Sequence, residues 1–363
     1  MSFLKSNKKK ILYYYYPLAL ILLVVMGFAL YVATKNNVDV VIEPEVKEPF
    51  VPTPIVAKTK DVSEGAWIVY WEPDSYQTIE NTNYLIGEQV FFAALFDQRG
   101  NLYIPESLKN VRDSIPWNTA SHQYLCITND VIYDDGTAGA KTTRCLEQLL
   151  TSPEHMDEMA HKMFDAAVSL HCDGVEMDIE NLNNGTNFWP QYVKLLERCV
   201  YWADRYNMDC RVALGAYAPM SEYNFPEELE YTYMCYALHG KFNDPGPKVT
   251  QKFLYDTVKR FSNVKRKRFA ISNECFDWWP AEKAGRYDCV TLTLDDIYDI
   301  FEAHKDVVIN RDPDSYGLYF NYWDDRGKHT VWYQDDKTFD FWKEKLREYN
   351  GDENTGVDLW RIE

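Results

Sequence analysis

The chain is short of positive charge: 38 Lys and Arg residues stand against 56 Asp and Glu residues, which gives a formal net charge of -18 at pH 7. This balance argues against nucleic acid as a partner, because its phosphates would be repelled, and it favours neutral ligands over strongly anionic polymers. Cys-x-x-Cys and His-x-x-x-His spacings are missing, so the sequence does not support a zinc site. We expect neither a metal nor an organic cofactor, and no segment suggests a protein partner.

Charge is also missing from residues 11–33, an apolar stretch that follows Lys5, Lys8, Lys9 and Lys10. At about 1.5 Å per residue the stretch is long enough to cross a hydrocarbon core of roughly 30 Å, and the lysines predict that the N-terminus stays in the cytoplasm. No small-x-small cleavage motif follows, so an uncleaved membrane anchor is favoured over a signal peptide, whose removal would give a secreted protein. No cysteine follows closely, which argues against a bacterial lipoprotein.

The rest of the chain divides into a linker and one large domain. Residues 34–64 contain four prolines and no hydrophobic periodicity, which predicts an extended linker, and residues 65–363 have enough apolar content for a sizeable core. We therefore expect a single-pass protein of the cell membrane with its large domain outside the cytoplasm.

Eight cysteines in that compartment permit disulfides. Two pairs are loop-compatible, Cys199 with Cys210 and Cys275 with Cys289, and the pairing stays open.

Residues 173–180 place acidic side chains two positions apart in an otherwise apolar strand. Alternate side chains of a strand share a face, so Glu176, Asp178 and Glu180 line one face and apolar residues line the other. Neighbouring buried carboxylates cannot all ionise cheaply, so at least one should keep its proton near neutral pH, as a general acid must. The alternatives are a solvated edge strand and a calcium site, although a calcium loop would contain more Asp, Asn and Gly.

Eight strand-like runs alternate with helical stretches, which is typical of a parallel sheet with helical crossovers. We expect strands at 66–71, 89–96, 123–128, 174–180, 211–216, 231–238, 268–272 and 317–323, and helices at 153–171, 188–206, 251–261, 294–304 and 338–349. Eight strands in a domain of this length predict an α/β fold, the (β/α)8 TIM barrel, with an open doubly wound sheet as the alternative. Active sites of such barrels lie at the C-terminal ends of the strands, where Glu180 would stand.

The acidic run resembles the DxxDxDxE motif on the fourth strand of glycoside hydrolase family 18, the chitinases and endo-β-N-acetylglucosaminidases. Asp173, Asp178 and Glu180 match it, and Glu176 replaces the middle Asp. The resemblance implies hydrolysis with retention, in which the 2-acetamido group of the sugar attacks the anomeric carbon. Glu180 would protonate the leaving oxygen and then deprotonate water, while Asp178 would bind the acetamide N–H with Glu176 and Asp173 in support. An anionic neighbour should keep Glu180 protonated until it is needed.

A second match, with departures, lies on the sixth strand. Residues 234–236 are similar to the family's MxYD, which makes Tyr236 the expected hydrogen-bond donor to the acetamide, but Ala237 replaces the Asp that usually helps to bind it. Residues 126–129 on the third strand lack both glycines of the family's SxGG segment. We expect both departures to affect the sugar-binding side of the barrel and to leave Glu180 untouched.

Aromatic side chains near the predicted strand ends could pack against sugar faces. The family has an aromatic floor on the eighth strand, for which the resemblance offers three residues of the run 317–323. The predicted substrate contacts are Trp323, Tyr319, Asn321, Trp71, Tyr217 and His239. The sequence therefore predicts a hydrolase of glycans with β-linked N-acetylglucosamine, such as chitin-like chains, peptidoglycan-derived chains or N-glycan cores. The alternative is a catalytically inactive glycan-binding protein on the same barrel.

Overall fold

The computed structural model describes residues 64–72, 87–116, 120, 122–283 and 285–362. The predicted anchor at 1–33 and the predicted linker, except for its last residue, lie outside these ranges. Within them, no helix combines the length and the apolar character that crossing a membrane requires.

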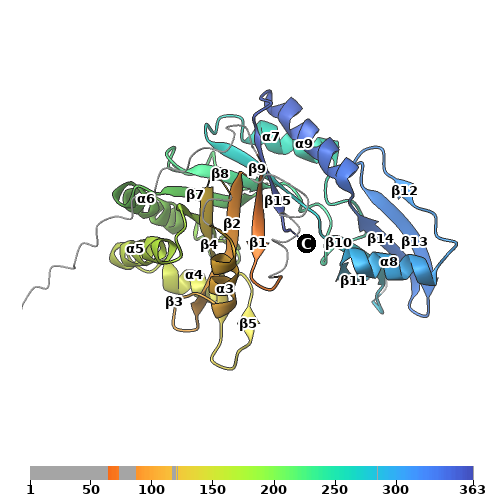
Figure 1. Cartoon of the computed structure of the whole chain (residues 1–363), viewed down its shortest axis with the longest axis horizontal. Helices are drawn as coiled ribbons and strands as arrows, with labels where there is room; N and C mark the ends of the chain where they lie inside the picture. The colour runs from red at the N-terminus through yellow and green to blue at the C-terminus, as the bar shows by residue number, and fades with distance from the viewer. Residues whose placement is uncertain (1–63, 73–86, 117–119, 121, 284, 363) are drawn as a thin grey trace, which may run out of the picture. The chain divides into compact units, whose positions relative to one another are not determined.

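Eight parallel strands form a closed barrel (Figure 1). They are β1 (Glu64–Val69), β2 (Glu88–Asp97), β4 (His122–Ile132), β6 (Gly174–Asp178), β7 (Asp209–Gly215), β8 (Glu230–Met234), β9 (Lys267–Ser272) and β15 (Gly356–Trp360). The sheet closes because β2 pairs with both β1 and β4 while β15 pairs with both β1 and β9. The predicted TIM-type barrel is confirmed, and this closure excludes an open sheet. Two short strands, β3 (Leu102–Tyr103) and β5 (Ala138–Gly139), add antiparallel partners to β2 and β4.

Seven helices occur among the described residues: α3 (Glu106–Ser114), α4 (Thr143–Leu149), α5 (Pro153–Ser169), α6 (Trp189–Tyr206), α7 (Gln251–Arg260), α8 (Leu294–Ala303) and α9 (Asp336–Asn350). Local capping explains where several of them begin. The Ser152 hydroxyl accepts a hydrogen bond from the His155 N–H and a proline opens α5, while Asp335 and Thr338 form a reciprocal capping box at α9. All five predicted helices exist, with small differences at their ends.

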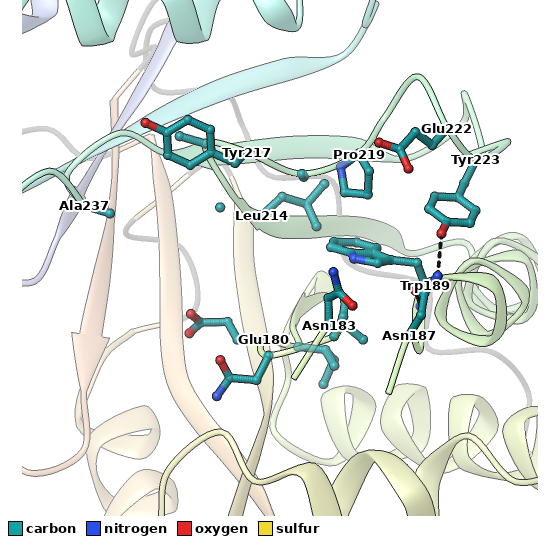
Figure 2. A pocket seen from close by; sticks show the side chains of 16 residues that line it. Glu180, Asn183, Asn187, Trp189, Leu214, Tyr217, Pro219, Glu222, Tyr223 and Ala237 are labelled. Atoms are coloured by element: carbon teal, nitrogen blue, oxygen red, sulfur yellow. Dashed lines mark hydrogen bonds between the residues drawn. The ribbon is translucent and has the colours of Figure 1, made fainter. Parts of the chain in front are cut away.

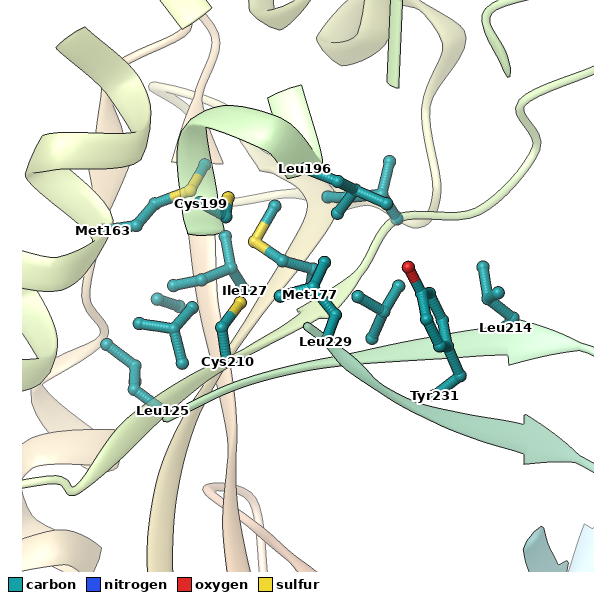
Figure 3. Packing of buried hydrophobic residues seen from close by; sticks show 14 of the residues in the cluster. Leu125, Ile127, Met163, Met177, Leu196, Cys199, Cys210, Leu214, Leu229 and Tyr231 are labelled. Carbon is teal, nitrogen blue, oxygen red and sulfur yellow. The ribbon is translucent and has the colours of Figure 1, made fainter. Parts of the chain in front are cut away.

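The apolar face of β6 packs outward against the helical layer. Met177 lies among Leu125 and Ile127 of β4, Met163 of α5 and Leu196 of α6 (Figure 3). Complete burial of each such side chain contributes about 1.5–3 kcal/mol. Because β6 is apolar outside and acidic inside, the alternation predicted from residues 173–180 is confirmed.

Ionic contacts fill part of the barrel interior. Arg211 donates to Glu176 at 2.6 Å, to Asp358 at 3.0 Å and to Glu88. Arg268 donates to Asp358 at 2.5 Å and to Glu88 at 3.2 Å. Both guanidinium groups are buried, so their charges are balanced by carboxylates from strands far apart in the sequence, as buried charges require.

Two glycines make room for these contacts. A Cβ at Gly65 would collide with the carboxylate of Asp358, and a Cβ at Gly356 would collide with the guanidinium of Arg268. Glycine is required at both positions because side chains from neighbouring strands occupy the space that a Cβ would need.

The predicted eighth strand at 317–323 is wrong. Those residues form β13 (Leu318–Asp324), which belongs to a five-stranded antiparallel sheet with β10 (Cys275–Pro280), β11 (Tyr287–Leu292), β12 (Asn310–Arg311) and β14 (Gly327–Tyr333). This sheet and α8 are inserted between β9 and α9, so the predicted helix at 294–304 is not a barrel crossover. The eighth barrel strand is β15, which follows α9.

All eight cysteines carry free thiols, and seven of them are buried. Neither loop-compatible pair is bonded. Cys199 and Cys210 lie in the core between α6 and β7 (Figure 3), where the hydrogen bond between their thiols, together with burial, raises the pKa of Cys210.

Candidate active site

The two motif carboxylates stand side by side at the C-terminal end of the barrel. Asp178 is the last residue of β6 and is buried, whereas the Glu180 side chain, two residues further on, is 39% exposed. The buried Asn129 of β4 fixes the backbone of Glu180: its Oδ1 accepts from the Glu180 N–H at 2.9 Å and its Nδ2 donates to the Glu180 carbonyl at 3.0 Å. The third-strand departure therefore does touch Glu180, contrary to the sequence-based expectation.

A lysine that the sequence analysis did not single out contacts both carboxylates. The Nζ of Lys141 lies 2.6 Å from Oδ2 of Asp178 and 3.1 Å from Oε1 of Glu180. It also lies 5.4 Å from the ring centre of Phe92, within range of a cation–π contact. Lys141 follows the β4–β5 hairpin, so the connection after the third barrel strand supplies a cation to the acidic end of the fourth.

Burial and charge act against each other on these groups. Burial raises the pKa of Asp178 to about 7, although Lys141 opposes the shift. Burial alone would lower the pKa of Lys141, but the carboxylates of Asp178 and Glu180 outweigh it and raise that pKa, so the ammonium stays charged. One Asp178 oxygen, Oδ1, is buried and has no hydrogen-bond partner among the described residues, which makes it available to a donor on a ligand.

The other two motif acids are engaged elsewhere. Glu176 accepts hydrogen bonds from Trp67 Nε1 at 2.6 Å and from Arg211 Nε at 2.6 Å, so its side chain is held in place by these two donors. Asp173 precedes β6, at the opposite end of the strand from Asp178, and its carboxylate accepts from the backbone N–H of Gln123 at 2.9 Å. Its contact ties β4 to β6 and is structural.

Tyr236 lies two residues beyond β8 and faces the carboxylates. Burial first, and then the negative charges of Asp178 and Glu180, raise the pKa of its hydroxyl, which therefore stays protonated and able to donate. Tyr236 therefore lies close enough to the two acids to feel their charges, and its predicted hydrogen bond to an acetamide stays a prediction.

A pocket of about 480 Å³ opens beside Glu180, across the ends of β6, β7 and β8 (Figure 2). Ala237, which stands where the family motif has an Asp, also lines this pocket. Amide and aromatic side chains line the pocket: Asn183, Asn187, Trp189, Tyr217 and Tyr223. Such a mixture of rings and hydrogen-bonding groups suits a sugar.

The predicted substrate contacts separate into two groups. Tyr217 lines the pocket beside Glu180, and the exposed Trp71 lies 5.8 Å from Phe92, ring centre to ring centre. His239 instead lines a second pocket, of about 980 Å³, between the loop after β8 and the β10–β11 hairpin.

The three residues of the mispredicted strand lie on β13, away from any barrel strand. Tyr319 stacks on Trp332 at 4.7 Å, Asn321 accepts from the Thr330 hydroxyl at 2.9 Å, and Trp323 is 68% exposed. Their predicted role depended on a place in the barrel that they do not have.

Trp360 occupies that place instead. It ends β15, the true eighth strand, with its ring 4.7 Å from Phe92 and 5.9 Å from Trp67. A signal for this strand was present in the sequence: the run Gly-Val-Asp-Leu-Trp at 356–360 repeats the glycine, valine and acid of Gly-Val-Glu-Met-Asp at 174–178.

No family model matches the sequence, and no curated protein matches it either. Solved structures do match its fold. The spore cortex-lytic enzyme SleL of Bacillus cereus is 15% identical, with a TM-score of 0.66 over 85% of this chain and 72% of that one. A chitinase from Chromobacterium violaceum is 15% identical, with a TM-score of 0.64 over 82% of this chain and 94% of that one.

The family 18 chitinase from Cycas revoluta, solved in complex with (GlcNAc)3, is 12% identical, with a TM-score of 0.63 over 82% of this chain and 94% of that one. At these identities the likeness establishes the fold. The chain has the (β/α)8 barrel fold of the glycoside hydrolase family 18 enzymes.

Proposed function

We propose that this protein is a glycoside hydrolase that cleaves glycans containing β-linked N-acetylglucosamine, by substrate-assisted hydrolysis with retention. The observation that carries the proposal is the adjacency of Glu180 and Asp178 at the C-terminal end of the barrel, with a pocket of about 480 Å³ beside Glu180. Two similar structures support the substrate class: a cortex-lytic enzyme and a chitinase in complex with (GlcNAc)3.

In the proposed reaction Glu180 gives its proton to the glycosidic oxygen while the acetamide oxygen of the bound sugar attacks the anomeric carbon. The resulting oxazolinium ion is positively charged, and the free Oδ1 of Asp178 accepts a hydrogen bond from its N–H. Tyr236 donates to the acetamide from the other side. Glu180, now an anion, takes a proton from water, which attacks the anomeric carbon and restores the sugar with its original configuration.

The apolar stretch at 11–33 supports the accompanying proposal that the enzyme is anchored in the cell membrane with its barrel outside the cytoplasm. Digestion of intact cells with an external protease would remove the barrel from such a protein. Protection of the barrel until the cells are lysed would contradict the proposed orientation.

A second candidate function is glycan binding without cleavage. Two observations favour it. The ammonium of Lys141 already contacts Oε1 of Glu180, and Ala237 replaces the Asp that helps the family to bind the acetamide. Both functions use the same pocket, so only turnover separates them.

The deciding experiment incubates the full chain, in a mild detergent, with chitooligosaccharides, peptidoglycan fragments and an N-linked glycopeptide, and identifies products by mass spectrometry. Cleavage that is lost in Glu180→Gln and kept in Glu197→Gln, which changes an exposed carboxyl on α6, would establish the hydrolase and name its substrate. A β-anomeric product at early times in proton NMR would show retention. Binding of the same glycan by all three proteins without any product would establish the binding protein instead.

A further inference from the structure

Lys141 has all of its donors satisfied by the two carboxylate residues. An ammonium group carries three N–H donors, and three oxygens lie within reach of Nζ: Asp178 Oδ2 at 2.6 Å, Glu180 Oε1 at 3.1 Å and the Asp178 carbonyl at 3.3 Å. The lysine side chain is only 18% exposed. These contacts form a compact unit, which we name the Lys141 triad: Lys141, Asp178 and Glu180.

The backbone of Lys141 is held from both sides. Its N–H donates to Oδ1 of Asp130 at 2.7 Å, and its carbonyl accepts from Nδ2 of Asn181 at 2.9 Å. Its φ is +49°, in the left-handed region that lysine adopts at a cost in free energy. Contacts from β4 and from the loop after β6 therefore fix the Cα of Lys141 and aim its side chain at the two acids.

The charges that face the triad come from several elements. Asp130 of β4 adds a negative charge near Lys141, and Glu176 adds one below Asp178, although Glu176 is already paired with Arg211. The Tyr236 hydroxyl and the Cys126 thiol face the carboxylates and are neutral, since burial and these carboxylates raise both of their pKa values. Among the described residues Lys141 is the only lysine or arginine in an ion pair with Asp178 or Glu180.

We propose that Lys141 is a positioning residue of this site: its ammonium orients both carboxylates and sets the pH range in which the pair keeps the proton that Glu180 must donate. A cation placed between two carboxylates favours their ionised forms. It therefore limits how far burial can raise the pH at which the pair loses its proton. In its catalytic consequence this inference rests on the proposed function, but the titration of the two carboxyl groups can be measured whether or not the protein turns over a substrate.

The same geometry indicates how the triad changes when a glycan binds. When the glycosidic oxygen approaches Glu180, we expect the ammonium to give up the longer contact, 3.1 Å to Oε1 of Glu180, and to keep the shorter one, 2.6 Å to Oδ2 of Asp178. Because the backbone of Lys141 is fixed, this is a rotation within the side chain.

The test compares the full chain with Lys141→Met, Lys141→Arg and Lys343→Met. Lys343 is a matched control, since it is 15% exposed and pairs with two carboxylates, Glu64 at 3.3 Å and Asp340 at 3.4 Å, on and near α9. Infrared titration follows the band of protonated carboxyl groups, with Asp178→Asn used to assign the signal of the pair.

We expect Lys141→Met to raise the pH at which the pair loses this proton by roughly 1–2 units. Lys141→Arg and Lys343→Met should change that pH by less than about half a unit. The high-pH limit of hydrolysis should move by the same amount. An unshifted midpoint in Lys141→Met, or an equal shift in Lys343→Met, overturns the inference. An upward shift in Lys141→Arg, which keeps the charge, overturns it too, and this arm holds even if Lys141→Met does not fold.

The two proposals fail separately. A shifted titration without hydrolysis by any variant would leave the inference standing and reject the hydrolase. Hydrolysis by the unmodified chain, with a high-pH limit that Lys141→Met does not move, would leave the hydrolase standing and reject the inference.

Discussion

Replacing Asp178 by Asn should stabilise the protein at neutral pH, although Asp178 is central to the proposed chemistry. Burial raises the pKa of this carboxyl from 3.8 to about 7, so the folded state holds its proton more tightly than the unfolded state does. The stability that this group contributes is therefore complete below about pH 4 and is lost as the pH rises through 7. An asparagine at the same position has no proton to lose.

The magnitude follows from the difference between the two pKa values. A shift of about three pH units at about 1.4 kcal/mol per unit gives about 4 kcal/mol. This is an upper bound, because in Asp178→Asn the ammonium of Lys141 keeps only one carboxylate partner. The variant should equal the parent protein near pH 4 and exceed it by as much as about 4 kcal/mol near pH 8.

Urea unfolding of the full chain, followed by tryptophan fluorescence between about pH 4 and pH 8, measures this difference. A difference that does not depend on pH would show that Asp178 is ionised throughout, and that Lys141 outweighs burial. Asp358→Asn is the control, because Asp358 is equally buried but Arg268 and Arg211 overcome the effect of burial and lower its pKa. This variant should be less stable than the parent protein by about 3–5 kcal/mol at every pH from 5 to 8.

Two further predictions concern aromatic and thiol groups. Trp360→Ala should weaken binding of N-acetylglucosamine oligomers at least tenfold in calorimetry, because it removes about 1.5 kcal/mol or more of ring contact at the barrel end. Trp323→Ala, on the inserted sheet, should change the affinity less than about twofold. In the native chain a thiol reagent should react with at most one cysteine, the partly exposed Cys289, whereas in urea it should react with all eight. Rapid reaction of several native thiols would contradict the buried positions of the other seven.

The features that depend on local pattern could be predicted from the sequence. The alternation at 173–180 places Met177 in the core and Asp178 inside the barrel, since a strand has only two faces. The strand at 317–323 was misassigned because its aromatic alternation is strong, yet such alternation is typical of an antiparallel sheet with one buried face. The short run at 356–360 has its first three residues buried, on both faces of the strand, so its alternation is weaker.

The residues that complete the site could not be predicted in this way. Lys141 is a single lysine in a turn, and nothing in its neighbours shows that the chain returns it to the end of β6. Asn129 was visible only as a departure from a family motif, and its two hydrogen bonds to Glu180 depend on the register between β4 and β6. Contacts of this kind are set by tertiary structure.

The closure of the barrel also constrains how the chain reaches its fold. Glu64 of β1 aligns with Val357 of β15, so the joint that seals the sheet connects segments from opposite ends of the domain. Until β15 has been synthesised, β1 and β9 lack the strand that pairs with both of them, and Arg211 and Arg268 lack Asp358. Contacts between such distant segments form slowly, and bare edges invite aggregation. The barrel therefore closes only after the whole domain has been synthesised. Conditions that prevent aggregation before closure should determine the yield of soluble protein.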